Sequence, residues 1–269
     1  MQQEPAFQNM DALGLLRWYL AAGVDELAGA APVNRFAEKA AEPAPTAAAP
    51  AGARAAPPPA RLKSAENIKE EAEAIAQSCT SLAELEAAVR AFDGCALKHT
   101  ATHTVFAAGN ADSPLMLIGD APGGEEDRQG KPFVGDAGQL LDKMLAAIGL
   151  GRDEVYMANI LFWRPPGNQK PSPQQSMACL PFVKRHIALA RPKLLVFLGG
   201  ISAGLLLDTT QGITRLRGKW TSYSGGAGDH EAIPAIATYH PANLLQQPHF
   251  KADAWRDLLE IRSRLETLK

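Results

Sequence analysis

Few cysteines and no long apolar runs limit the kind of protein that this sequence can encode. Its three cysteines, Cys79, Cys95 and Cys179, are widely separated and odd in number, which argues against a disulfide framework. No apolar run approaches the ~20 residues that a membrane-spanning helix needs. The first residues, Met1–Pro5, lack the basic start and apolar core of a signal peptide. We therefore expect a cytoplasmic protein with no membrane partner.

An excess of charge of either sign is also missing, because the formal net charge of the 269 residues is −2. A strongly basic composition would indicate a nucleic-acid partner, and the global charge gives no such signal. A local basic surface is still compatible with this balance. The hydrophobic fraction of 46% is ordinary for a globular protein, so function has to be inferred from local motifs.

Composition divides the chain into three parts. Residues 1–40 contain the apolar segment Leu13–Leu20, then a glycine break and a further helical turn, which predict an N-terminal helical extension. Residues 41–61 are dominated by alanine and proline. Because such a segment buries too little surface to order itself, we expect a mobile linker there. Residues 62–269 are predicted to form one globular domain.

Within this domain, apolar strands alternate with helical patterns after an opening helix over about 65–92. The strands are predicted at 115–118, 155–161, 194–198 and 235–239. Ser172, Pro173 and Gln175 predict the start of one intervening helix, as its cap, its first residue and the end of a capping box. This alternation is typical of a parallel sheet covered on both faces. The sequence therefore predicts an α/β fold, a three-layer α/β/α sandwich with a central four-stranded parallel sheet.

A glycine-rich loop with carboxylates and one aromatic residue directly follows the first predicted strand. Residues 119–135 read GDAPGGEEDRQGKPFVG. In open α/β sheets ligands bind beyond the carboxyl ends of the strands, so the loop predicts a pocket at this edge. A phosphate-binding turn is the alternative. It is disfavoured because the loop matches neither glycine-rich phosphate motif and its four acidic residues would repel phosphate.

Polar residues also follow other strands of the predicted sheet. Asp120 and Glu126 come after the first strand, Asn159 ends the second, and His240 follows the last. Because parallel strands bring their carboxyl ends to one edge, we expect these side chains to converge. Taken singly, Asn159 could cap a turn and His240 could be an ordinary loop histidine.

Together these motifs resemble the family 4 uracil-DNA glycosylases of bacteria and archaea. The resemblance rests on the loop 119–135, the sequence AGQLL at 137–141, the segment 159–168 with its RPPGN end, and HPA at 240–242. It spans about 94–265. It implies a monomeric, monofunctional enzyme of base excision repair, with residues 62–269 as the catalytic domain. Such an enzyme flips uracil out of single- or double-stranded DNA and hydrolyses the N-glycosidic bond, leaving an abasic site without strand cleavage.

The resemblance also assigns roles to individual residues. Glu126, together with Asp120, would position or activate the attacking water, and His240 would stabilise the departing uracil anion. Phe133 would stack on the flipped base, and Asn159 would read its Watson–Crick edge. The expected uracil-binding residues are Phe133, Asn159, Ala121 and Gly123. Asp120 stands where the family usually has glutamate, which is one methylene longer, so the resemblance favours Glu126 over Asp120 for the direct catalytic role. The remaining charges of the loop, Glu125, Asp127 and Arg128, are expected to be solvated.

Residues around the pocket are expected to contact DNA. Leu244 or Leu245 would fill the gap left by the flipped nucleotide, with ordinary helix packing as the alternative. The sequence TRLRGK at 214–219 carries three cations without an acid, which favours phosphate contact over a merely solvated loop. The expected DNA-binding residues are Asn168, Arg215, Arg217, Lys219, Leu244 and Leu245.

The resemblance fails at the iron–sulfur ligands. Family 4 enzymes typically hold a [4Fe–4S] cluster with four cysteines, and the matching positions here are Phe92, Cys95, Trp163 and Cys179. Because two of the four ligands are replaced by aromatic residues that cannot bind iron, we expect no cluster and no other cofactor. Phe92 and Trp163 are expected to fill the space by apolar packing. Cys79 is expected to be an ordinary core residue.

Two other functions are left as alternatives. The first is a non-catalytic, DNA-binding repair scaffold that kept the fold after losing the cluster, against which the retention of Glu126, Asn159 and His240 argues. The second is a relative that traps uracil-DNA covalently through a histidine in an inserted basic loop. The corresponding residues here, 213–220, contain no histidine.

Overall fold

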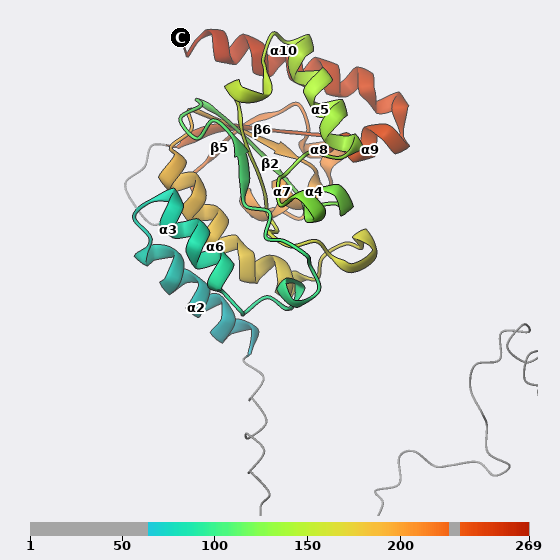
Figure 1. Ribbon diagram of the computed structural model, residues 1–269. Helices are drawn as coiled ribbons and strands as arrows, with labels where there is room; N and C mark the ends of the chain where they lie inside the picture. The colour runs from blue at the N-terminus through green and yellow to red at the C-terminus, as the bar shows by residue number, and fades with distance from the viewer. Residues whose placement is uncertain (1–63, 226–231, 269) are drawn as a thin grey trace, which may run out of the picture. The chain divides into compact units, whose positions relative to one another are not determined.

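Four parallel strands form the centre of a six-stranded sheet in the computed structural model, which describes residues 64–225 and 232–268 (Figure 1). The strands are β1 Ala107–Gly109, β2 Leu115–Gly119, β3 Tyr156–Asn159, β4 Leu194–Leu198, β5 Trp220–Tyr223 and β6 Ile233–Thr238. Their order is β1-β3-β2-β4-β6-β5. The pairs β3–β2, β2–β4 and β4–β6 are parallel, whereas β1 and β5 add antiparallel edges.

This arrangement confirms the α/β class and extends the predicted sheet by two edge strands. The strand 194–198 has its predicted bounds, whereas the predicted 155–161 is shortened to β3. All residues of β2, β3 and β4 are buried, which explains why they form continuous apolar runs. Neither edge strand has such a run: β1 has only three residues, and three of the four residues in β5 are exposed.

Helices cover both faces of the sheet. The α-helices are α2 Ala65–Ser78, α3 Leu82–Ala91, α4 Gly124–Gln129, α5 Asp136–Ala147, α6 Pro173–Ala190, α7 Gly200–Leu206, α8 Ile213–Leu216, α9 Pro241–Gln246 and α10 Lys251–Glu266. Short 3₁₀ turns are η1 Ala96–His99, η2 Arg152–Glu154, η3 Pro166–Asn168 and η4 Pro248–Phe250. None of the described helices is long and apolar enough to cross a membrane.

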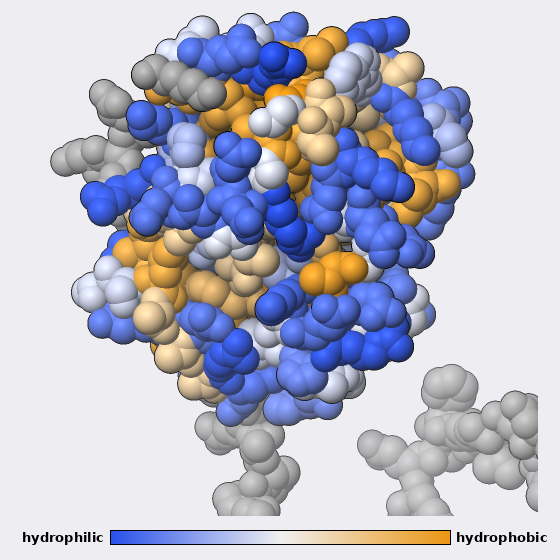
Figure 2. All heavy atoms as spheres, turned by 45° about the horizontal axis from the view of Figure 1, so that its top comes forward, coloured by the Kyte–Doolittle hydropathy of each residue, from blue (hydrophilic) through white to orange (hydrophobic). Residues whose placement is uncertain are grey.

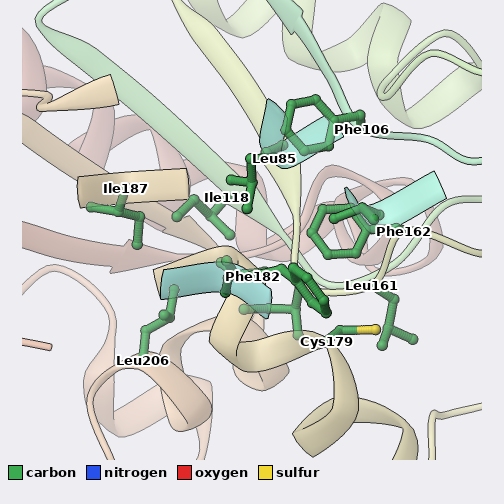
Figure 3. Close-up of a cluster of buried hydrophobic side chains, with 14 of the residues drawn as sticks. Leu85, Phe106, Ile118, Leu161, Phe162, Cys179, Phe182, Ile187 and Leu206 are labelled. Atoms are coloured by element: carbon green, nitrogen blue, oxygen red, sulfur yellow. The ribbon is translucent and has the colours of Figure 1, made fainter. Parts of the chain in front are cut away.

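Alternate side chains of the central strands enter two separate cores. Met116 and Ile118 of β2 pack with α2, α3 and α6, whereas Leu115 and Leu117 pack with α5, α9 and α10. The same helices lie on opposite sides of the sheet in Figure 1. Aromatic and aliphatic side chains, among them Phe162, fill the first core in Figure 3. This two-sided burial gives the three layers expected from the sequence.

The opening helix predicted over 65–92 is wrong in one respect, because it is two helices. Ser81 caps α3 by accepting a hydrogen bond from the Glu84 N–H at 3.2 Å, and the Glu84 carboxylate accepts from the Thr80 N–H at 2.6 Å. These local bonds favour a new helix start over continuation. Cys79 is buried at the end of α2, as expected for a core residue. The start of α6 at Ser172 is as predicted.

The described residues belong to a compact unit that spans Ala60–Lys269. The predicted extension, residues 1–40, and the predicted linker, residues 41–61, lie outside the described residues. Figure 2 shows one face of the molecule, where hydrophilic side chains surround smaller apolar areas. This is the surface expected when the large apolar side chains are used in the two cores.

Candidate active site

The carboxyl ends of the parallel strands bring the predicted polar residues together. Asp120 follows β2, Asn159 ends β3, and His240 caps α9 after β6. A Cβ atom added to Gly119 would lie 2.4 Å from Asn159 Oδ1 and 2.6 Å from Phe133 Cζ. The rings of Phe133 and His240 stack with centroids 6.0 Å apart. The absence of a side chain at Gly119 therefore makes room for an amide and an aromatic ring that meet at one place.

Phe133 is held in this position by a constrained backbone. Its φ of 56° lies in the left-handed region, which non-glycine residues seldom adopt. The Arg152 guanidinium donates to the Pro132 carbonyl at 2.8 Å. Gly138 packs so closely that an added Cβ would lie 1.9 Å from the Phe133 carbonyl oxygen. The contacts from Arg152 and Gly138 thus fix the direction of the Phe133 ring.

Glu126 joins the two ends of the same loop. It lies in α4, a short helix where we expected an open loop, and its side chain is 7% exposed. One carboxylate oxygen accepts the Gly123 N–H at 3.1 Å, and the other accepts the N–H groups of Val134 and Gly135, each at 2.9 Å. Three backbone donors on one carboxylate make a strong local tie between the first turn of the loop and the segment that carries Phe133.

Asp120 differs from Glu126 because only one of its oxygens is hydrogen-bonded within the described residues. Oδ1 accepts the backbone N–H of Ser202 at 2.7 Å. Gly199 is the residue that lets the carboxylate fit, since an added Cβ there would lie 2.4 Å from Oδ2. Asp120 is partly exposed, and its Oδ2 is available to a ligand or a water.

Asn159 carries a buried amide oxygen without a partner. The residue is 2% exposed, and Oδ1 has no hydrogen bond within the described residues. Leaving a buried acceptor unpaired costs about 1–3 kcal/mol, so such atoms in native proteins need an explanation. A donor on a bound ligand would satisfy this oxygen.

His240 has its tautomer fixed by the helix that it caps. Its Nδ1 accepts the backbone N–H of Ala242 at 3.1 Å, so Nδ1 carries no proton and Nε2 carries the proton of the neutral ring. Loss of hydration on burial lowers the pKa of His240, and the Asp120 and Glu126 carboxylates oppose this shift. The imidazole is therefore a neutral hydrogen-bond donor at the pocket.

The other predicted uracil- and DNA-binding residues differ in exposure. Leu244 is 1% exposed and packs in the core beside α5 and α10, whereas Leu245 is 44% exposed. Ala121 and Gly123 lie partly exposed in the loop after β2. Asn168 is exposed at the end of η3. Only one of the two leucines, Leu245, therefore has a side chain at the surface.

The three cations of the basic segment also differ. Arg215 and Lys219 are exposed and have no ion pair within the described part of the chain. The Arg217 guanidinium instead donates to the Asp257 carboxylate and, at 2.7 Å, to the Asp253 carbonyl. Thr238 also donates to Asp257, at 2.6 Å. Arg217 is thus used inside the protein, where it joins the basic segment to α10.

One expectation about the loop charges is wrong. Asp127 is not solvated but 5% exposed, and it accepts the N–H groups of Thr102 and His103 at 2.8 and 3.1 Å. It holds the segment before β1 against α4. Glu125 and Arg128 form an exposed ion pair with each other, which agrees with the solvated positions expected for them.

Arg164 and Ser202 also lie at this site, although neither was predicted from the sequence as a site residue. The Arg164 Nε atom donates to Asn168 Oδ1 at 2.8 Å, and its guanidinium lies beside Gly124. Its place directly before the PPGN motif was the available signal. Ser202 contributes only a backbone N–H, to Asp120, and a backbone donor leaves no signal in the sequence.

The residues at the four family cluster positions do not fit a [4Fe–4S] cluster. All four are buried in one apolar core, where Phe92 packs on Phe182 at 5.0 Å between centroids. The indole of Trp163 donates to Thr104 Oγ1 at 3.1 Å. Only Cys95 and Cys179 offer sulfur, and they share a hydrogen bond. This contact and burial raise the pKa of Cys179 well above its usual value, so its thiol keeps its proton.

Within residues 64–225 and 232–268, no cluster of three or more histidine, cysteine or acidic side chains could hold a metal ion. Four thiolates are the ligand set of this cluster type. Two thiols and two aromatic rings do not supply that ligand set.

Comparison with known proteins agrees with the fold. The family description that matches is "Uracil DNA glycosylase superfamily", over residues 106–259, more than half of the chain. These residues include all six described strands and the residues Asp120, Phe133, Asn159 and His240. The fold and the site therefore define a protein of this superfamily.

Individual relatives narrow this to one family. The type-4 uracil-DNA glycosylase of Archaeoglobus fulgidus is 36% identical over 173 residues, which cover 62% of this chain and 84% of the relative. That of Sulfurisphaera tokodaii is 36% identical over 194 residues, covering 70% and 87%. That of Thermotoga maritima is 35% identical over 159 residues, covering 59% and 80%. The chain belongs to the type-4 uracil-DNA glycosylase family.

Proposed function

We propose that this protein is a monofunctional uracil-DNA glycosylase that starts base excision repair. It hydrolyses the bond between uracil and deoxyribose and leaves an abasic site. The observation that carries this function is the buried, unpartnered Asn159 Oδ1 beside the Phe133 ring, at the edge where Asp120 and His240 also lie. A flat base with an N–H on its edge satisfies both groups.

Base selection follows from the hydrogen-bonding pattern of this pocket. Asn159 Oδ1 accepts from uracil N3–H, the amide N–H₂ donates to O4, and the base stacks on Phe133. Cytosine presents an acceptor at N3 and a donor at N4, so it leaves polar groups unpaired in a buried site. Ala121 and Gly123 complete the pocket. Because these groups lie inside the fold, the base has to leave the DNA helix to reach them.

Departure of uracil is assisted by His240. Breaking the glycosidic bond places negative charge on uracil, and the Nε2–H donor stabilises it at O2. The ring does not need to be a cation for this, because a neutral donor in a water-poor site is effective against developing charge. Nδ1, held by the Ala242 N–H, keeps the donor on the correct side.

The two carboxylates have different roles. Asp120 has a free oxygen near the pocket, so it orients the attacking water, accepts its proton and stabilises the positive sugar. Glu126, whose oxygens receive three backbone N–H groups, positions the loop that carries Phe133. Glu126 thus contributes to catalysis through geometry, and its negative charge still favours the cationic sugar at longer range.

DNA is bound around the pocket, in single- or double-stranded form. Leu245, which is exposed, is the residue that fills the space of the flipped nucleotide, while Leu244 packs in the core. Arg215 and Lys219 contact phosphates, and Arg217 holds the segment that carries them. Residues 62–269 form the catalytic domain, which works as a cytoplasmic monomer without a cluster.

One assay tests the function against its alternatives. The protein is incubated with an oligonucleotide that contains a single uracil, and samples are run with and without alkali on a denaturing gel. Cleavage that requires alkali is expected, because an abasic site is left intact by a monofunctional enzyme. Absence of product would support a non-catalytic scaffold instead. A slow band that survives denaturation would support covalent trapping, and a cut without alkali would contradict a monofunctional enzyme.

A further inference from the structure

Arg164 lies beside the active-site loop without an acidic partner among the residues that the structure describes. Its Nε donates to Asn168 Oδ1 at 2.8 Å. Its Cζ and both Nη atoms lie 3.5–3.6 Å from the position of a Cβ added to Gly124, the first residue of α4. Gly124 directly follows Gly123 at the pocket. The side chain is partly exposed, so its Nη groups remain available as donors to a ligand.

The segment after Arg164 is built to hold this side chain. Pro165 and Pro166 restrict the backbone, and Gly167 and Asn168 then adopt left-handed φ values of 62° and 54°. The Asn168 N–H bonds to the Pro165 carbonyl at 3.0 Å and closes the turn. Asparagine tolerates this conformation better than most residues, and its side chain supplies the acceptor for Arg164. Asn168 thus both adopts the backbone conformation of the turn and orients the Arg164 guanidinium.

A cation beside the pocket would offset the negative charge of the carboxylates around it. Asp120 and Glu126 are both acidic and lie near the place where the sugar must enter, and they repel the phosphates on either side of it. The nearby cation Arg128 is already paired with Glu125 and exposed. Arg164, by contrast, has no acidic partner among the residues with described positions. Two Nη donors in one plane match two oxygens of a phosphate.

We propose that Arg164 binds a backbone phosphate next to the flipped nucleotide and that Asn168 is the residue that positions it. This inference rests on the proposed glycosylase function, because that function brings a nucleotide to the pocket. It gives Asn168 an indirect part in DNA binding, through Arg164. Arg164 contributes affinity and register without contacting the base, so its effect is independent of the base in the pocket.

The experiment compares Arg164→Gln with Arg128→Gln, a matched loss of one arginine from the same region. The dissociation constant of a uracil-containing oligonucleotide and of its thymine counterpart is measured over a range of salt concentrations. Single-turnover uracil release is measured at saturating enzyme. We expect Arg164→Gln to weaken binding of both oligonucleotides by roughly 10-fold and to reduce the salt slope by about 0.7–0.9, the value of one phosphate contact. The saturated rate is expected to stay within about threefold of wild type.

A second variant separates the phosphate contact from general folding effects. Asn168→Gly keeps the left-handed turn but removes the acceptor, so we expect weaker binding with most of the salt slope retained. Arg128→Gln is expected to leave the slope unchanged. An unchanged slope in Arg164→Gln, or an equal loss in Arg128→Gln, would overturn the assignment. Failure of the glycosylase function is distinct, since wild-type protein would then release no uracil whatever the salt slope.

Discussion

Glu126 accepts a hydrogen bond from the backbone N–H of Gly135 at 2.9 Å, across nine residues of sequence. This bond, with those from Gly123 and Val134, closes the active-site loop on itself. Asp120, in contrast, is anchored through one oxygen and keeps the other free. The two carboxylates are close in sequence, and their different surroundings support the positioning role proposed for Glu126 and the catalytic role proposed for Asp120.

This separation predicts different defects for two similar substitutions. Glu126→Gln places an N–H₂ group against backbone donors, so we expect the free energy of unfolding to fall by about 1.5–3 kcal/mol, with activity lost through a loosened loop. Asp120→Asn keeps an acceptor for Ser202, so we expect near-normal stability but a saturated rate lower by roughly 10²-fold. Thermal melts and single-turnover kinetics measure both. The assignment is wrong if Asp120→Asn keeps its rate while a stable Glu126→Gln loses it.

Gly119 offers a test of the base pocket. In Gly119→Ala the new methyl would lie 2.4 Å from Asn159 Oδ1 and 2.6 Å from Phe133 Cζ, so one of these groups has to move. We expect uracil release to fall by roughly 10²-fold, because displacement of about 1 Å in an active site has this effect. Gly212→Ala is the matched control, since its methyl would meet nothing within 4 Å. Equal activity of the two variants would place the uracil pocket elsewhere.

Replacement of Asn159 tests base selection directly. The carboxylate of Asn159→Asp has only acceptors, so it loses the donor to uracil O4 and accepts from the cytosine amino group instead. We expect the ratio of uracil to cytosine release to fall by roughly 10²-fold. Release from oligonucleotides with U and C at one position gives this ratio. Asn110→Asp, at an exposed position, is the control. An unchanged ratio in Asn159→Asp would show that Asn159 does not read the base.

The central sheet and the convergence of polar residues were predictable from the sequence for one physical reason. Buried parallel strands leave continuous apolar runs, and topology alone brings the residues after each strand to one edge of the sheet. The edge strand β5 was not predictable because most of its side chains are exposed. The partners of Glu126 are backbone N–H groups, which no residue type reveals. The sequence predicted Arg217 as a phosphate ligand because its partner, Asp257, is forty residues away in the chain and gives no local signal.

The aromatic residues Phe92 and Trp163, at two of the positions that the resemblance assigns to cluster ligands, predict an iron-free protein. Purified protein is expected to be colourless and to contain no stoichiometric iron; a brown protein with bound iron would contradict this. Phe92 has a structural role in place of a ligand, so Phe92→Ala should lower the free energy of unfolding by about 3–5 kcal/mol. Leu259→Ala, at a residue that is 43% exposed, should change it by no more than about 0.5 kcal/mol. Chemical denaturation of both variants measures the difference.

The neutral state of His240 predicts the shape of the pH profile. Burial lowers its pKa below the usual ~6.5, so the native ring binds fewer protons than the unfolded one between these two values. Its contribution to stability is therefore complete above pH ~6.5 and is lost as the pH falls through the native pKa.

The rate of uracil release should depend on the same protonation. Nδ1 of His240 already accepts the Ala242 N–H, so protonation would break that bond and disturb the Nε2–H donor. We expect the single-turnover rate to stay level from pH 8 to ~6.5 and to fall only below the native pKa. His240→Asn, which lacks this titration, should be slower by roughly 10²–10³-fold and should lack the acid limb that His240 causes. A wild-type rate that rises as the pH is lowered from 8 to 6 would show that the charged imidazole is the active form.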